Sequence, residues 1–583
     1  MSSSQRHWSD QYGNQEYYRW RSFTRHGRTT YLRPLGNFEA GFDSDGRYHQ
    51  GLADMTLSLD LQLRSHLSDE DLRQHITQAW ACFRCKHLLS QSKAVHRDAL
   101  GGEGALPENE IFFAIDPPNT AAQAIADATT QLVFLRDHFE TVDRDDFWLH
   151  CQNSARNIDP DRVLAKLFVL PPQAKEDGLL DFRLHLVCAH EVCDGVAMSL
   201  WVRSLLTFLN EPPRALREHL GTLLEPERLS TRLPQAQEAL YPPIQGNAAQ
   251  RRWFWAITRI LRHVHKPLPA AFENPLRRHH PRPQSVSLPP TYAPVLDYSR
   301  PPSLNTFPCY ATMPVKAARR LHQLCQDANT SVGAGVFALA ALLMMEMYER
   351  REPAVPLSQR RPFLANFPLN PRAFFNRHVD PDSCMIGFSD GICLHFLPSH
   401  LDLGGRLKLL ARQADRQLAT YQKRSATTIV IDDTTLRHRG SRGADRILPM
   451  LYLYSLERRS AALPPHRRPP PPNPQGAYPV PPNASPPTCA VSSVGRKEAV
   501  VRPGLYDLDD DTRDVVADFR AMSSAVRPRV GEFLCGVGGE LNTSLGMNAS
   551  VDGNAIDPVL AAEWCRRFAT VLEDEPEGMS AKL

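Results

Sequence analysis

One short stretch of the chain combines residue types that could carry out acid–base chemistry. It contains His190, followed four residues later by Asp194 and then directly by Gly195. Imidazole has an unperturbed pKa of about 6.5, so it can take a proton from a hydroxyl or amine and return it to a leaving group. The aspartate is too close in sequence to relay protons easily. We interpret it as the partner of an arginine elsewhere that locks the turn, while Gly195 permits a tight bend.

The flanking sequence predicts the elements that position this stretch. Upstream, apolar residues alternate from Phe182 to Cys188, which is the period-two pattern of a strand. Downstream, apolar residues recur at helical spacing until two consecutive prolines end the run at Pro213. His190 is therefore predicted at a strand-to-helix turn, where a rigid backbone could project it into a crevice. Taken alone, the pattern also fits a histidine that is merely packed or solvated.

Read with its context, His190-x-x-x-Asp194-Gly195 resembles the active-site motif of the CoA-dependent acyltransferase superfamily. That superfamily includes chloramphenicol acetyltransferase, plant acyltransferases, peptide-synthetase condensation domains and fungal O-acetyltransferases. The resemblance covers the chain from about Arg33 to its end, although only the His190 motif is specific. Other segments support it by their order and spacing, namely residues 71–90, 314–348, 355–362, 489–500 and 541–572.

Two departures from the superfamily's patterns narrow the resemblance. Condensation domains usually carry a second histidine directly before the motif, and here that residue is Ala189. The plant enzymes carry Asp-Phe-Gly-Trp-Gly near the C-terminus, and this chain has nothing similar. The sequence therefore most resembles the fungal secondary-metabolite O-acetyltransferases, of which the trichothecene O-acetyltransferases are the type.

The resemblance implies a fold and an activity. The fold would be α/β, with two chloramphenicol-acetyltransferase-like halves, each a mixed sheet flanked by helices, and a channel between them. The activity would be transfer of an acyl group, in the first instance acetyl, to a hydroxyl of a small hydrophobic metabolite such as a trichothecene-type terpenoid. His190 would be the general base. Acetyl-CoA would be a co-substrate, and no bound cofactor and no metal are expected.

The resemblance also suggests roles for residues outside the turn. The tetrahedral oxyanion of acyl transfer needs a hydrogen-bond donor, which a serine of the channel-lining strand could supply. An arginine at the end of a strand would pair with Asp194, and a turn before a buried helix would lie near CoA. The candidates for these three roles are, in that order, Ser492 and Ser493, Arg360 and Arg361, and Thr330 and Ser331.

Length and composition bound the organisation and the partners. A chain of 583 residues exceeds one ordinary core. We divide it into an N-terminal half at residues 1–225, a proline-rich crossover at 226–307 and a C-terminal half at 308–583 with a proline-rich insertion at 464–487. The net charge of +3 implies neither nucleic acid nor a membrane as a partner. The partners expected are an acyl-CoA and a small hydroxylated acceptor.

Targeting and redox features favour a cytoplasmic protein, which we expect to be a monomer. The first twenty residues have no apolar core of the kind a signal peptide needs. The most hydrophobic run, Val332 to Met345, is shorter than the roughly 20 residues of a membrane helix and reads as a buried core helix. The 12 cysteines are scattered without a disulfide framework and are interpreted as reduced, mostly buried thiols.

Two alternatives to acyl transfer by His190 remain open from the sequence. Gly387-Phe388-Ser389-Asp390-Gly391 matches the nucleophile elbow of serine hydrolases, which would make the protein an esterase or transacylase using Ser389. That motif needs a helix after it, whereas Ile392 to Leu397 reads as a strand, so a turn between strands fits better. The other alternative is a non-catalytic relative that binds a metabolite, or binds a partner through the proline-rich segment.

Overall fold

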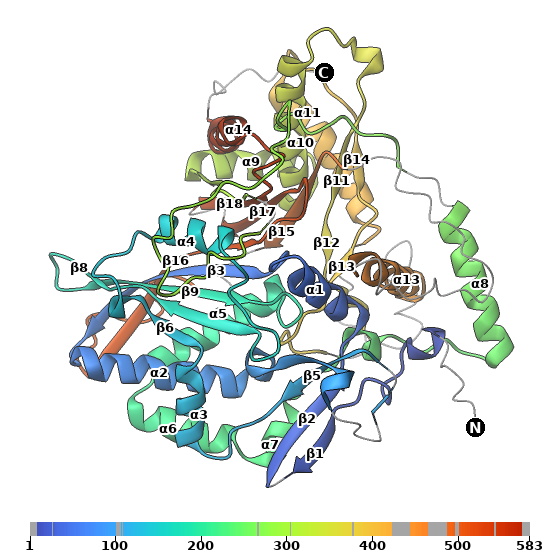
Figure 1. Ribbon diagram of the computed structural model, residues 1–583. Helices are drawn as coiled ribbons and strands as arrows, with labels where there is room; N and C mark the ends of the chain where they lie inside the picture. The colour runs from blue at the N-terminus through green and yellow to red at the C-terminus, as the bar shows by residue number, and fades with distance from the viewer. Residues whose placement is uncertain are drawn as a thin grey trace.

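A computed structural model gives the fold of the chain (Figure 1). Within the residues it describes, two lobes are each built on a mixed sheet flanked by helices, which confirms the predicted fold class. The described residues are 8–25, 27–100, 106–107, 109–264, 268–302, 305–375, 378–421, 444–463, 487–495, 501–540 and 544–573. The predicted proline-rich insertion lies outside them, except for its last residue.

The sheet of the first lobe has the strand order β16-β3-β9-β7-β6, and β8 pairs with β9 outside this path. Its strands are β3 (Met55–Ser65), β6 (Leu132–Phe134), β7 (Ala165–Val169), β8 (Gln173–Ala174), β9 (Leu180–Cys188) and β16 (Val515–Val526). Only the β6–β7 pair is parallel. The helices of this lobe are α2 (Asp69–Lys86), α3 (Ala121–Thr129), α4 (Arg144–Asn153), α5 (Gly195–Leu209), α6 (Pro213–Leu223) and α7 (Pro226–Thr231).

The sheet of the second lobe has the strand order β10-β18-β17-β15-β11-β14. Its strands are β10 (Tyr310–Met313), β11 (Phe363–Asn366), β14 (Ile392–Leu394), β15 (Cys489–Gly495), β17 (Phe533–Glu540) and β18 (Ser544–Val551). The central strand β15 runs parallel to both of its neighbours. The helices around this sheet are α9 (Val315–Asp327), α10 (Val332–Arg351), α11 (Leu403–Leu418) and α14 (Pro558–Thr570).

Smaller elements complete the molecule. A four-stranded sheet has the order β1-β2-β5-β4, and β12 pairs with β13. The bounds are β1 (Arg21–Arg25), β2 (Arg28–Pro34), β4 (Lys93–His96), β5 (Ile111–Ile115), β12 (Pro368–Leu369) and β13 (Gly387–Phe388). Three further helices are α1 (Asn37–Tyr48), α8 (Ala248–Val264) and α13 (Ala444–Ala462). Figure 1 shows α1 and α13 between the two large sheets and α8 at the edge of the molecule.

Strand β16 crosses from the C-terminal part of the chain into the sheet of the first lobe. It pairs with β3 in antiparallel register from Val515 to Val526, with a register shift between Phe519 and Ala521. Val515, Ala517 and Phe519 are buried there in the hydrophobic core of the first lobe. The sequence did not reveal this exchange, because an alternating pattern predicts a strand without saying which sheet it joins. The exchange holds the two halves of the chain together by strand pairing and packing.

Two neighbouring segments show where sequence reasoning held and where it did not. Helix α10 is long and apolar enough to cross a membrane, but it is mostly buried inside the protein, as the core-helix interpretation predicted. The segment 355–362 was expected to be a strand end bearing arginines. It instead forms a short 3-10 helix at Leu357–Gln359, and strand β11 begins only at Phe363. Prolines at 356 and 362 flank this turn, and proline lacks the backbone N–H that strand pairing needs.

Candidate active site

The His190 turn joins β9 to α5, as the periodicity of the sequence predicts. Strand β9 ends at Cys188, and Asp194 is the N-cap of α5. One carboxylate oxygen of Asp194 accepts hydrogen bonds of 2.9 Å from the backbone N–H groups of Val196 and Ala197. These N–H groups have no partner inside the helix, so the cap satisfies them and fixes the direction of the turn.

The second carboxylate oxygen of Asp194 binds the other lobe. It lies 2.8 Å from the guanidinium of Arg372 and accepts a 2.8 Å hydrogen bond from the backbone N–H of Met385. Both side chains of the ion pair are buried. Arg372 also donates to the backbone carbonyl of Ser383 at 2.6 Å. Asp194 therefore makes no hydrogen bond to His190 among the described residues, and its role in the structure is to lock the turn.

The predicted arginine partners of Asp194 are wrong, although an arginine partner exists. Arg360 pairs with Glu349 and lies 5.0 Å from the ring centroid of Phe396. Arg361 lines a separate cavity of about 310 Å³ beside the end of α10. Both arginines precede β11, whereas Arg372 follows β12 and reaches the facing lobe.

Residues 382–385 hold the second lobe against the His190 turn at several points. The carboxylate of Asp382 lies 2.6 Å from Nδ1 of His87 and accepts a 3.0 Å hydrogen bond from the indole of Trp201. The thiol of Cys384 lies 3.9 Å from Nδ1 of His190. With the bond from Met385 to Asp194, this short segment fixes the position of the histidine relative to both lobes.

His190 itself is buried and oriented by an aromatic ring. Its imidazole stacks on Phe42 of α1 with ring centroids 4.2 Å apart and an interplanar angle of 10°. Burial, and to a smaller extent the charge of Arg529, lower the pKa of His190 to about 4, against the raising effects of backbone hydrogen bonds and of Asp194. The imidazole is therefore neutral at physiological pH, which is the state a general base requires.

Two arginines lie over the same Phe42 ring. The guanidinium of Arg458 is 5.3 Å from the ring centroid, and that of Arg529 is 5.7 Å away. Both share one carboxylate oxygen of Asp45, at 3.3 Å and 2.8 Å. Because α1, α13 and the segment after β16 meet here, this cluster places positive charge close to the imidazole from both lobes.

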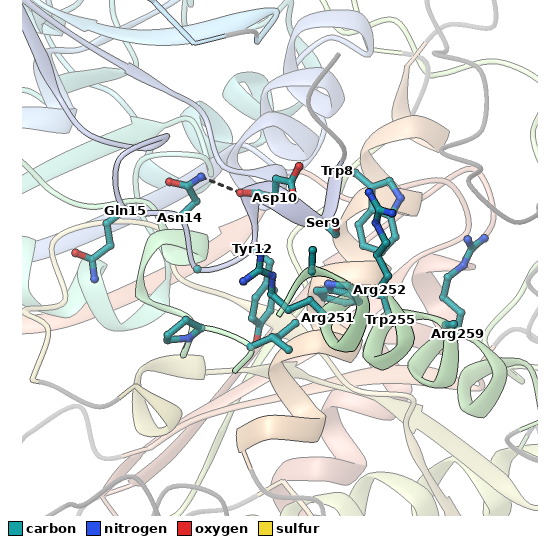
Figure 2. Close-up of a pocket in the computed structure, with 15 residues that line it drawn as sticks. Trp8, Ser9, Asp10, Tyr12, Asn14, Gln15, Arg251, Arg252, Trp255 and Arg259 are labelled. Atoms are coloured by element: carbon teal, nitrogen blue, oxygen red, sulfur yellow. Dashed lines mark hydrogen bonds between the residues drawn. The ribbon is translucent and has the colours of Figure 1, made fainter. Parts of the chain in front are cut away.

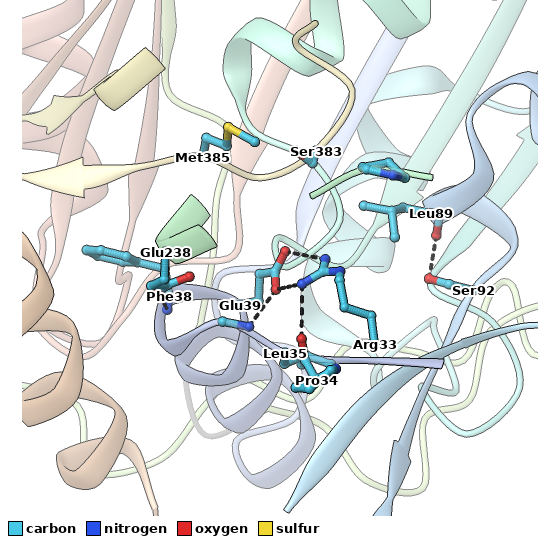
Figure 3. Close-up of polar contacts among 12 residues, drawn as sticks. Arg33, Pro34, Leu35, Phe38, Glu39, Leu89, Ser92, Glu238, Ser383 and Met385 are labelled. Atoms are coloured by element: carbon cyan, nitrogen blue, oxygen red, sulfur yellow. Dashed lines mark hydrogen bonds and ion pairs between the residues drawn. The ribbon is translucent and has the colours of Figure 1, made fainter. Parts of the chain in front are cut away.

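The N-terminus of α1, which carries Phe42, is anchored by buried carboxylates. Figure 3 shows the guanidinium of Arg33 facing the carboxylate of Glu39, with two hydrogen bonds of 2.8 Å. Glu238 accepts a 2.8 Å hydrogen bond from the backbone N–H of Asn37. Burial and the charge of Glu39 raise the pKa of Glu238 to about 7. These contacts fix the helix that orients the His190 ring.

Glu191, directly after the histidine, is a buried carboxyl group without a hydrogen-bond partner among the described residues. Burial raises its pKa well above the usual value, and the nearby carboxylate of Asp43 adds to this, whereas Arg156 opposes it. Arg156 is instead engaged by two 2.8 Å hydrogen bonds to Asp54. The raised pKa means that the fold favours the neutral form of the Glu191 carboxyl more than water does.

The other candidates of the sequence lie on the second lobe. Ser492 and Ser493 are on β15, as expected. The hydroxyls of Ser331 and Ser493 lie 3.9 Å and 4.0 Å from where a Cβ on Gly333 would stand, so the strand and the start of α10 come together. Ser331 caps α10 and binds Asp415, and Thr330 bonds to the carbonyl of Cys325. No hydrogen bond joins these residues to His190 in the described part of the chain.

The Gly-x-Ser-x-Gly match lacks the geometry of a nucleophile elbow. Ser389 follows β13 and precedes β14, so no helix begins after it. Its hydroxyl accepts a 3.1 Å hydrogen bond from the backbone N–H of Phe367, and its own N–H donates to the carbonyl of Phe367 at 3.0 Å. The residue therefore closes a turn between strands, which was the preferred interpretation of the sequence.

Several residues of the site had no signal in the sequence. Phe42, Cys384, Arg458 and Arg529 come from elements far apart along the chain, and their approach to His190 depends on packing. Only Arg372 has a signal in the sequence, because it directly follows the apolar residues of β11 and β12. Among the described residues, no group of three or more His, Cys, Asp or Glu side chains could hold a metal ion.

Comparisons with known proteins agree with this geometry at the level of the fold. No protein-family model matches the sequence, and no curated protein sequence does. The structure of TRI3 trichothecene 15-O-acetyltransferase from Fusarium sporotrichioides matches with a TM-score of 0.61 at 11% identity, over 96% of this chain and 98% of that one. The first condensation domain of the calcium-dependent antibiotic synthetase gives a TM-score of 0.48 at 12% identity, over 95% and 96%. The starter condensation domain of rhizomide synthetase, solved with C8-CoA, gives 0.47 at 11%, over 93% and 94%. The match to the TRI3 structure shows that this chain shares its fold.

Proposed function

We propose that the protein is a CoA-dependent O-acyltransferase, with His190 as the general base. The observation that carries this proposal is the His190 turn. Its imidazole is neutral and held by Phe42 where the two lobes meet, while Asp194 is turned away into the pair with Arg372. The acceptor we propose is a hydroxyl of a small hydrophobic metabolite.

In the proposed reaction, His190 moves one proton twice. The ring nitrogen Nδ1 faces the thiol of Cys384, which leaves Nε2 to face the acceptor. Nε2 takes the hydroxyl proton as the acceptor oxygen attacks the thioester carbonyl of acyl-CoA. A tetrahedral oxyanion forms, the C–S bond breaks, and the imidazolium returns the proton to the thiolate of CoA. The products are an ester and free CoA, and no covalent enzyme intermediate is needed.

The second lobe supplies the donor side in this proposal. Ser492 or Ser493 would donate a hydrogen bond to the oxyanion. Thr330 and Ser331 would lie near CoA, and the approach of Ser331 to Ser493 at Gly333 supports one continuous path along this lobe. Arg412 of α11 is near this turn, since it donates a hydrogen bond to the carbonyl of Ala328 at the end of α9. Arg412 is thus our candidate for a phosphate contact.

The proposal also covers which acyl group is transferred and which class of acceptor receives it. TRI3 is an acetyltransferase acting on a trichothecene. By analogy with it, we propose acetyl-CoA as the donor and a hydroxylated terpenoid as the acceptor of this chain. The fold shared with TRI3 supports this proposal.

The decisive experiment compares wild type with His190→Gln. Purified protein is incubated with acetyl-CoA and a panel of hydroxylated terpenoids and polyketides, and mass spectrometry detects the acylated product. Release of the CoA thiol is followed with a thiol reagent, to which eleven of the protein's twelve cysteines are inaccessible by burial. Removing the general base should lower turnover by about 10²–10⁴-fold. Near-normal turnover in a folded His190→Gln variant would refute the mechanism.

A further inference from the structure

Helix α8 exposes its apolar face to solvent. Trp253, Ile257, Ile260 and Leu261 are 66%, 39%, 44% and 58% exposed. Their spacing of four, seven and eight residues from Trp253 places all four on one side of an α-helix. These four residues, which we call the α8 apolar face, are four of the thirteen large hydrophobic side chains that are exposed among the described residues. A contiguous apolar patch of this kind marks an interaction site.

The opposite side of α8 is the one that packs on the protein. Trp255 lies 5.0 Å from Trp8 and 5.8 Å from Tyr452, measured between ring centroids. Beside this contact is a pocket of about 810 Å³ between α8 and the segment 8–15. Figure 2 shows that Trp255 and three arginines, Arg251, Arg252 and Arg259, line this pocket from α8. The arginines therefore lie along the flanks and back of the helix, away from the centre of its apolar face.

The charge of α8 is unlike that of the whole chain. Its sequence, AAQRRWFWAITRILRHV, contains four arginines and no acidic residue. The chain as a whole has a net charge of only +3, which is why composition gave no reason to expect a membrane. Arg251 and Arg252 are exposed at the start of the helix. Long arginine side chains on the flanks of an apolar face can extend to a charged surface while their stems cover apolar groups.

We propose that α8 docks the protein on an anionic lipid surface, with the α8 apolar face buried among the acyl chains and the flanking arginines at the phosphate groups. An arginine-rich helix with Trp, Ile and Leu on the other face has the chemistry of an interfacial helix. The apolar face is a single convex helix, which a fluid lipid surface covers without a shaped groove. A second copy of the chain could also cover this face, and it is one of the outcomes of the test below.

This inference goes beyond the proposed function and does not depend on it. If the acceptor is hydrophobic, docking would bring the enzyme to the place where that acceptor dissolves. Lipid binding is measured without any turnover, so its failure and the failure of the proposed reaction can be told apart.

The test is sedimentation of the full chain with vesicles of phosphatidylcholine alone and of phosphatidylcholine mixed with phosphatidylserine. Wild type should bind the mixed vesicles, and binding should weaken with added salt. The Trp253→Ser/Leu261→Ser variant should bind at least about tenfold more weakly. Arg251→Gln and Arg252→Gln should each weaken binding about fivefold.

A matched control removes exposed apolar side chains elsewhere. The Val530→Ser/Val559→Ser variant changes residues that are 79% and 73% exposed, and it should bind like wild type. Thermal melting verifies that all variants are folded. The proposal is overturned if wild type ignores the mixed vesicles, or if the control variant loses binding as strongly as the α8 variant. It is also overturned if sedimentation velocity shows a dimer that Trp253→Ser/Leu261→Ser dissociates, since a second copy would then cover the face.

Discussion

Two turns of this protein carry the residue pattern of a catalytic centre, and they differ in what the surrounding elements do with it. The His190 turn leads from a strand into a helix, and its aspartate reaches across to the other lobe. The Ser389 turn leads from one strand into another, and its hydroxyl is occupied by the backbone of Phe367. Both residues are buried. A matching sequence motif therefore does not make a residue available for chemistry. The element that follows the turn and the groups that contact the side chain decide this.

The largest expected effect is the loss of stability on removing Asp194. Asp194→Ala leaves the guanidinium of Arg372 buried without its partner and uncaps α5, so we expect the free energy of unfolding to fall by about 3–5 kcal/mol. Asp194→Asn keeps an oxygen for the N–H groups of Val196 and Ala197 and should cost less. Urea denaturation measures both. Equal stability of both variants and wild type would contradict the locking role of Asp194.

The His190 turn also differs from the Ser389 turn in its charge environment. The dependence of kcat/KM on pH measures the effect of this environment on His190. The pKa of about 4 predicts that kcat/KM stays level from neutral pH down and falls only near pH 4. Because the positive charge of Arg529 disfavours the imidazolium, Arg529→Gln should raise the pKa of His190 and move the acid limb to higher pH. Arg458→Gln is the matched control, since Arg458 shares Asp45 and Phe42 but is not among the largest causes of this pKa shift.

The same pKa has a consequence for stability. Unfolded histidine titrates near pH 6.5, so between about pH 6.5 and about 4 the unfolded chain binds more protons than the folded one. The contribution of His190 to stability therefore falls as the pH falls through this window.

In the kcat/KM profile, an acid limb that Arg458→Gln shifts as much as Arg529→Gln would contradict the assignment of the pKa shift to Arg529.

Glu191, in the same turn, is expected to have a smaller effect, on the pH dependence of stability. Burial raises the pKa of its carboxyl in the folded state, whereas in the unfolded chain the carboxyl ionises above about pH 4.3. Folding therefore takes up a proton, and stability falls as the pH rises above that value. Glu191→Gln removes this dependence, so its stability relative to wild type should rise by up to about 1.4 kcal/mol per pH unit. Urea denaturation between about pH 5 and 8 measures it, with the exposed Glu140→Gln as control. A constant difference across this range would mean that Glu191 is ionised in the fold.

The sequence predicted local structure at the site better than it predicted contacts. Strand β9, the turn at His190 and helix α5 followed from periodicity, and the resemblance supplied the fold. The partner of Asp194 was misplaced from Arg372 to Arg360 or Arg361, because an ion pair between distant residues depends on how the lobes meet. The stacking of Phe42 on His190 and the exchange of β16 between sheets share this cause. Each depends on tertiary packing that no local pattern contains.

The smallest effect is expected at the Ser389 turn. Ser389→Ala removes the acceptor of the N–H of Phe367 but keeps the backbone hydrogen bond between the two residues, so we expect a loss of about 1 kcal/mol in unfolding free energy. Acyl transfer should stay within about twofold of wild type, because the mutation leaves the general base in place. A fluorophosphonate should label neither protein, since no base activates this hydroxyl. Labelling of wild type that disappears in Ser389→Ala, together with loss of activity, would reverse the comparison and make the second turn the catalytic one.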